Sequence, residues 1–217
     1  LERAVANGVK TLVVQPTHLM HGAEYDEMCE ALDAYKDKIE NIVIAEPLLG
    51  EVGDDATVIN ADKEAVAKAV VAAAEADGSF ESMAKAAEEG TALVLMGHGT
   101  AHVAKVTYSQ MQTQMNELGY KNVFIGTVEG EPEETSCESV IEAVKAAGYT
   151  KVVLRPLMVV AGDHANNDMA GADEDSWKSM MEAAGLATEC QIAGLGRIDA
   201  VQDLYVAHTQ AAMDTLK

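Results

Sequence analysis

The chain has 217 residues, of which 48% are apolar and 24% charged, and its formal net charge is -21. This length suffices for one large domain or two small lobes, and the negative charge disfavours nucleic acid, whose phosphates call for a basic surface. No apolar run approaches the roughly 20 residues of a membrane span, and three widely spaced cysteines indicate neither a disulfide framework nor a zinc–thiolate site.

Short apolar runs that end in glycine or proline alternate with segments of helical period along the whole chain. In chain order, we expect strands over 10–17, 41–45, 92–96, 121–127, 151–160 and 188–192. We expect helices over 1–7, 24–39, 62–76, 79–89, 105–118 and 132–147, a short helix carrying Trp177, and a C-terminal helix after Gly196. The polar stretch 165–175 is expected to be a loop. This alternation predicts a parallel, doubly wound α/β architecture.

An internal repeat divides the chain. Gly8, Pro16 and Gly22 recur with their neighbours 140 residues later. The repeat predicts two similar α/β lobes, residues 1–90 and 91–217, each with a parallel sheet flanked by helices, and a cleft between them. We expect the C-terminal helix to pack back on the first lobe. Since two strand–helix units precede the repeated strand in the second lobe only, the first lobe is expected to be incomplete at its N-terminus.

Three polar side chains follow the carboxyl ends of predicted strands in the second lobe. They are His98, Glu129 and His164. Parallel strands end at one edge of the sheet, where open α/β sheets bind their ligands. Two imidazoles and one carboxylate suit a borderline divalent metal such as Co²⁺, Fe²⁺ or Zn²⁺. The pattern predicts a metal site in the second lobe, while the alternative for each histidine is an exposed or hydrogen-bonded loop residue.

The motifs of the chain are residues 14–19, 22 and 24–25, 96–102, 128–129 with 132–133, 156–169, 175–178, 194–196 and 206–208. Together they resemble the anaerobic sirohydrochlorin cobaltochelatase family, within the ferrochelatase-like superfamily. The resemblance covers essentially the whole chain, although the family's first strand has no counterpart here. It implies two α/β lobes with a tetrapyrrole in the cleft, and a metal held by His98, Glu129 and His164. The implied activity is Co²⁺ insertion into sirohydrochlorin, an early step of the oxygen-independent route to cobalamin, without an organic cofactor. Insertion of Fe²⁺, giving sirohaem, stays open.

Metal insertion requires the macrocycle to lose two N–H protons. A neutral imidazole, with an unperturbed pKa near ~6.5, can serve both as ligand and as base. We therefore expect His98 and His164 to present the metal, and His98 with Glu129 to receive the protons. Because sirohydrochlorin and the chain are both acidic, binding is expected to depend on local donors and on stacking of the ring. The candidates for substrate binding are His18, Met96, His102, Arg155 and Met158.

Two other classes of function remain open. A metal or tetrapyrrole carrier would bind without turnover. A phosphate-binding α/β enzyme would use Gly97-His98-Gly99, but this loop lacks the Gly-x-Gly-x-x-Gly pattern and a P-loop lysine. The composition favours a cytoplasmic location, with the periplasm as the alternative, and a homo-oligomer is one of the open oligomeric states.

Overall fold

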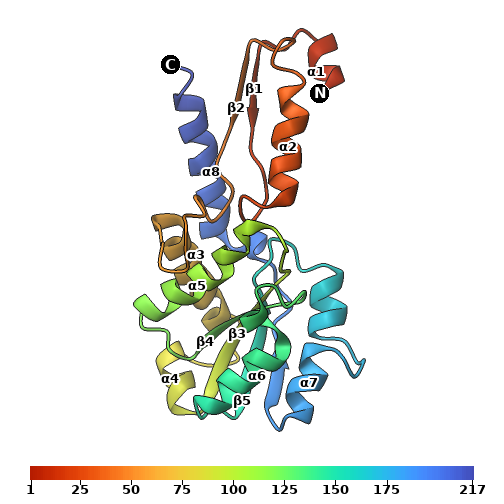
Figure 1. Cartoon of the computed structure of the whole chain (residues 1–217). Helices are drawn as coiled ribbons and strands as arrows, with labels where there is room; N and C mark the ends of the chain where they lie inside the picture. Colours follow the sequence, from red (N-terminus) through yellow and green to blue (C-terminus); the bar gives the residue numbers. More distant parts are fainter.

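The computed structural model describes all residues from Leu1 to Lys217. It contains two parallel sheets of different size (Figure 1). The small sheet lies at the end of the molecule that also carries both chain termini, and the large sheet lies at the other end. The C-terminal helix α8 (Asp199–Asp214) runs from the middle of the molecule to the end with the small sheet, beside β1 and β2.

The large sheet has the strand order β4-β3-β5-β6 and is parallel throughout. Its strands are β3 (Thr91–Gly97), β4 (Val123–Thr127), β5 (Lys151–Pro156) and β6 (Ala187–Cys190). Every residue of β3 is buried, as its unbroken apolar run predicts for a strand covered on both faces. The register pairs Gly97 with Thr127 and Met96 with Pro156. The ends of β3, β4 and β5 therefore lie side by side at one edge.

Helices cover both faces of the large sheet. Leu93 and Leu95 of β3 belong to one apolar cluster with α3 (Ala61–Ala76), α4 (Met83–Glu88) and α5 (Val106–Glu117). Ala92, Val94 and Met96, which point the other way, belong to a second cluster with α6 (Cys137–Ala146) and α7 (Trp177–Ala183). This alternation is the period of two that a strand imposes.

The small sheet pairs β1 (Thr11–Val14) with β2 (Asn41–Ile44), and α1 (Glu2–Ala6) and α2 (Ala23–Asp33) accompany it. None of its strand residues is fully buried. α8 contacts both strands as well as α3. The packing differs from the predicted division at residue 90, because α3 and α4 pack on the large sheet. Their apolar faces need a core to pack on, which the two-stranded sheet does not provide.

Two further expectations are corrected. The strand expected over 151–160 ends at Pro156, since proline has no N–H to continue the ladder. Within the expected loop 165–175, Ala165–Met169 forms a π-helical turn, η3. The remaining turns of helix are 3-10 segments: η1 (Val103–Lys105), η2 (Glu133–Thr135) and η4 (Leu195–Arg197). No helix has both the length and the apolar character needed to cross a bilayer.

Candidate functional site

His98, Glu129 and His164 lie together at the carboxyl edge of the large sheet. The ring centroids of His98 and His164 are 4.6 Å apart, and the rings stand edge to face at 79°. Nε2 of His98 lies 4.0 Å from Oε1 of Glu129. No group of three or more His, Cys, Asp or Glu side chains has the arrangement of a formed metal cluster. The predicted residues thus meet in an open arrangement, and their role as metal ligands stays a prediction.

Each of the two histidines has its Nδ1 atom engaged by an acceptor. Nδ1 of His98 lies 2.9 Å from the carbonyl oxygen of Gly99, and Nδ1 of His164 lies 2.8 Å from Oδ2 of Asp168. A carbonyl or carboxylate oxygen can only accept, so the Nδ1 atoms carry the protons in the neutral rings. The lone pairs then reside on the Nε2 atoms, and such hydrogen bonds orient histidines that bind metals.

Sequence reasoning missed this role of Asp168, which it placed among residues of a solvated loop. Asp168 reaches His164 because η3 makes the segment helical, and residues four apart share a face of a helix. The signal was present as a His-x-x-x-Asp spacing. The polar residues around it favour a loop, in which a spacing of four residues does not bring two side chains together.

Tyr108, on α5, holds the loop that carries His98. The backbone N–H of Gly99 donates to the Tyr108 hydroxyl at 3.1 Å, and the Tyr108 ring packs where a side chain at Gly97 would stand. Burial raises the pKa of Tyr108, so its hydroxyl stays protonated. The backbone N–H of Glu129 in turn donates to the carbonyl oxygen of His98 at 2.9 Å. The loops of His98 and Glu129 are therefore fixed to each other and to α5.

A cavity of about 500 Å³ lies beside these loops. The loop after β1 contributes His18, Leu19 and Met20, and the second lobe contributes His98, Glu129 and Met158. Half of the lining residues are apolar, and none is lysine or arginine. The cavity therefore offers apolar surface, two imidazoles and carboxylates to a ligand that lies between the two parts of the chain.

The five candidates for substrate binding separate into two groups. His18 and Met158 line the cavity. His102 does not line it: its Nδ1 accepts from the N–H of Ala104 at 3.1 Å, and its Nε2 lies 3.2 Å from Oδ2 of Asp26 on α2. Met96 is fully buried among α6 and α7. The prediction for Met96 is wrong because its position in β3 points it away from the cavity side.

The prediction that Arg155 binds the substrate is also wrong. Its side chain is only 2% exposed, and its Nη1 atom pairs with Asp77 and donates to Oε1 of Gln191 at 2.8 Å. Arg155 does not line the cavity. A buried guanidinium requires partners, and here they come from the end of α3 and from the residue after β6. Arg155 is therefore a structural link across the sheet.

A family model described as "Cobalt chelatase (CbiK)" matches residues 1–214. The sirohydrochlorin cobaltochelatase of Salmonella typhimurium is 29% identical over 214 residues, which are 99% of this chain and 73% of that protein. The sirohydrochlorin cobaltochelatase CbiKC of Nitratidesulfovibrio vulgaris is 30% identical over 207 residues, 94% of this chain and 66% of that protein.

Two solved structures resemble the whole chain. SirB from Bacillus subtilis with Fe³⁺ has a TM-score of 0.59 at 16% identity, covering 97% of this chain and 75% of that one. SirB from Bacillus subtilis subspecies spizizenii, a sirohydrochlorin chelatase in complex with cobalt, has a TM-score of 0.54 at 17% identity, covering 97% and 73%. At such identities the likeness concerns the fold, and it confirms the predicted chelatase-like α/β class.

Proposed function

The chain belongs to the cobalt chelatase family, whose model matches it almost from end to end, and from this membership we propose that it inserts Co²⁺ into sirohydrochlorin. The family identified from sequence motifs is thereby confirmed, and with it the class of enzyme. The observation that carries the proposal is the meeting of His98 with His164 and Glu129, of which His98 and Glu129 line a half-apolar cavity.

Insertion exchanges one cation for two protons. Co²⁺ enters the ring as two pyrrole N–H protons leave, so the protein must both present the ion and accept protons. The Nε2 lone pairs of His98 and His164 and the carboxylate of Glu129 supply nitrogen and oxygen donors of the kind that Co²⁺ binds. Three protein ligands leave coordination positions open. The ring nitrogens can take these positions before the protein releases the ion.

The protons can pass to the same groups. As the ring nitrogens replace Nε2 of His98, its lone pair becomes free to accept a pyrrole proton. Glu129, whose Oε1 lies 4.0 Å from that nitrogen, is the acceptor for the second pyrrole proton, so that both protons have a place in the site. Placing ligand and base in one side chain couples release of the metal to uptake of a proton.

The cavity lining indicates how the tetrapyrrole binds. Leu19, Met158 and Val159, which are half-buried, present apolar surface for a flat ring. Glu24 and Glu129 also line the cavity, and no lysine or arginine does. The acetate and propionate groups of sirohydrochlorin are therefore best placed toward solvent, with the reacting pyrrole nitrogens inside. The overall charge of -21 repels this anionic substrate, so affinity must come from these short-range contacts.

An anaerobic assay with Co²⁺, Fe²⁺ and Ni²⁺ in parallel tests the proposal. We expect the absorption spectrum of sirohydrochlorin to change with many turnovers per chain when Co²⁺ is supplied, above a blank without protein. Faster turnover with Fe²⁺ would identify iron as the preferred metal, since imidazole and carboxylate donors suit both ions. Binding of one equivalent without turnover would identify a carrier instead. Neither binding nor turnover would contradict the proposal altogether.

A further inference from the structure

Three polar side chains of α8, Tyr205, His208 and Thr209, contact the loops that follow β1 and β2. Their spacing of three and four residues places them on one face of the helix. We propose that this set, the α8 brace, positions the first-lobe wall of the cavity, so that Tyr205 and His208 are positioning residues for the tetrapyrrole. This inference rests on the proposed function, since it names how the same cavity keeps its shape.

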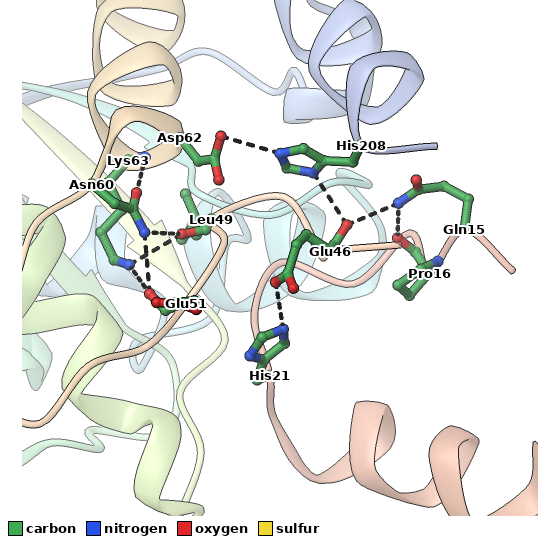
Figure 2. Close-up of polar contacts among 10 residues, drawn as sticks. All are labelled: Gln15, Pro16, His21, Glu46, Leu49, Glu51, Asn60, Asp62, Lys63 and His208. Carbon is green, nitrogen blue, oxygen red and sulfur yellow. Dashed lines mark hydrogen bonds and ion pairs between the residues drawn. The ribbon is translucent and has the colours of Figure 1, made fainter. Parts of the chain in front are cut away.

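His208 connects the loop after β2 to the beginning of α3 (Figure 2). Its Nδ1 lies 3.1 Å from the carbonyl oxygen of Glu46, and its Nε2 lies 3.1 Å from Oδ1 of Asp62. The His208 side chain is only 10% exposed. A neutral imidazole has one N–H, so only the doubly protonated ring donates to both oxygens. An acceptor at each nitrogen fixes the orientation of the ring.

Glu46 also contacts the loop after β1. Its carbonyl oxygen also accepts from Nε2 of Gln15 at 3.1 Å, and the same amide donates to the carbonyl oxygen of Pro16 at 2.9 Å. Oε2 of Glu46 lies 2.9 Å from Nε2 of His21 (Figure 2). Glu46, which His208 contacts, is therefore hydrogen-bonded to the first residue of the segment 15–21 and in contact with its last residue, although Nε2 of His21 has no aligned hydrogen bond.

The residues that His208 contacts are in turn held by α3, which packs on the large sheet. Asn60, which caps α3, donates through Nδ2 to the carbonyl oxygens of Leu49 and Glu51 at 3.0 and 3.1 Å. Nζ of Lys63 donates to the same two oxygens at 3.1 and 2.6 Å (Figure 2). Burial lowers the pKa of Lys63 to about 8. α3, which packs on the large sheet, thus anchors both Asp62 and the loop after β2.

Tyr205 holds the cavity wall directly. Its hydroxyl lies 3.2 Å from the carbonyl oxygens of both Thr17 and His18, and Thr209 donates to Oε1 of Gln15 at 2.7 Å. Burial raises the pKa of Tyr205, so the hydroxyl remains a donor. His18 places an imidazole in the cavity, and its backbone is therefore held by Tyr205 of α8, which lies 187 residues further along the chain.

The His18 ring packs edge-on toward the ring of Tyr25, with the centroids 6.4 Å apart. The Nδ1 atom of His18 is buried and has no hydrogen-bond partner. The position of the His18 ring therefore depends also on the backbone, which the N–H of Leu48 and the hydroxyl of Tyr205 both contact through the His18 carbonyl oxygen. Loosening the α8 brace should move this wall, while His98, Glu129 and His164 stay in place on the large sheet.

The test compares Tyr205→Phe and His208→Gln with Tyr120→Phe. Tyr120 packs against the same apolar cluster, but its hydroxyl makes no hydrogen bond within the chain. We expect the KM for sirohydrochlorin, and its Kd measured without metal by fluorescence quenching, to rise roughly five- to tenfold in each brace variant, as the loss of one hydrogen bond implies. The KM for Co²⁺ should stay unchanged, and Tyr120→Phe should behave as the wild type.

A second comparison asks whether Tyr205 acts through His18. In a His18→Ala background, Tyr205→Phe should add no further rise in the Kd for sirohydrochlorin, because the group that it positions is gone. Fully additive effects would overturn the inference, and so would equal losses of affinity for Co²⁺ and sirohydrochlorin. If the wild type inserts cobalt and the brace variants keep the normal Kd for sirohydrochlorin, the inference about the α8 brace is refuted while the proposed function stands. A wild type without insertion refutes the proposed function.

Discussion

Replacing His98 with alanine is expected to lower kcat for Co²⁺ insertion by roughly 10²- to 10⁴-fold, the range found when a positioned acid or base is removed. The substitution deletes the Nε2 atom that we expect both to hold the ion and to accept a pyrrole proton. Steady-state rates under anaerobic conditions, followed by the absorption of the metallated product, give the measurement.

His102→Ala is the matched control for this substitution. His102 lies four residues further along the same loop but does not line the cavity, and its contacts are with Ala104 and Asp26. We expect its kcat to stay within a few-fold of the wild type. Normal turnover in His98→Ala would show that His98 neither holds the ion nor accepts a proton, regardless of the result for His102→Ala.

Gly99→Ala is expected to lower kcat by roughly 10- to 100-fold, because small displacements of catalytic groups are costly. Gly99 has a φ of +95°, and a Cβ atom there would stand 2.8 Å from Cβ of Glu129 and 3.1 Å from Cβ of Thr127. The backbone cannot give way easily, since the N–H of Gly99 is bound to Tyr108. Glu129 must therefore move away from His98.

Gly148→Ala separates this contact from backbone strain. Gly148 has a similar φ of +87°, but nothing lies within 4 Å of the position that its Cβ would take. Gly148→Ala should lower the free energy of unfolding by about 1 kcal/mol for the left-handed backbone, and Gly99→Ala should lower it further because its Cβ also meets Glu129 and Thr127. Only Gly99→Ala should lose activity, as measured by kcat beside urea denaturation of the same samples. Equal activity in the two variants would show that the contact with Glu129 does not matter.

The sequence predicted the central part of the fold because one physical rule governs it. A fully apolar run such as β3 must be covered on both faces, and parallel strands end at one edge. From this rule alone, His98, Glu129 and His164 could be expected at the same edge, and the structure brings them together. Their distance, the tautomers and the part of Tyr108 could not be predicted, because they depend on how the loops pack.

The errors concern contacts between residues far apart in sequence. Arg155 was a candidate because an anionic substrate needs local donors, but the partners of its guanidinium are Asp77 and Gln191. The apolar face of α3 was visible in the sequence, although nothing local indicated which sheet it covers. The α8 brace likewise joins segments at opposite ends of the chain. Local periodicity carries no information about such pairings.

The position of a bound cobalt ion tests the central claim most directly. We propose to soak crystals of the protein with Co²⁺ and to locate the ion by anomalous scattering at the cobalt absorption edge. The account predicts one strong peak about 2.1 Å from the Nε2 atoms of His98 and His164, with the Glu129 carboxylate beside it. A strong peak elsewhere, with these three side chains unbound, would contradict it.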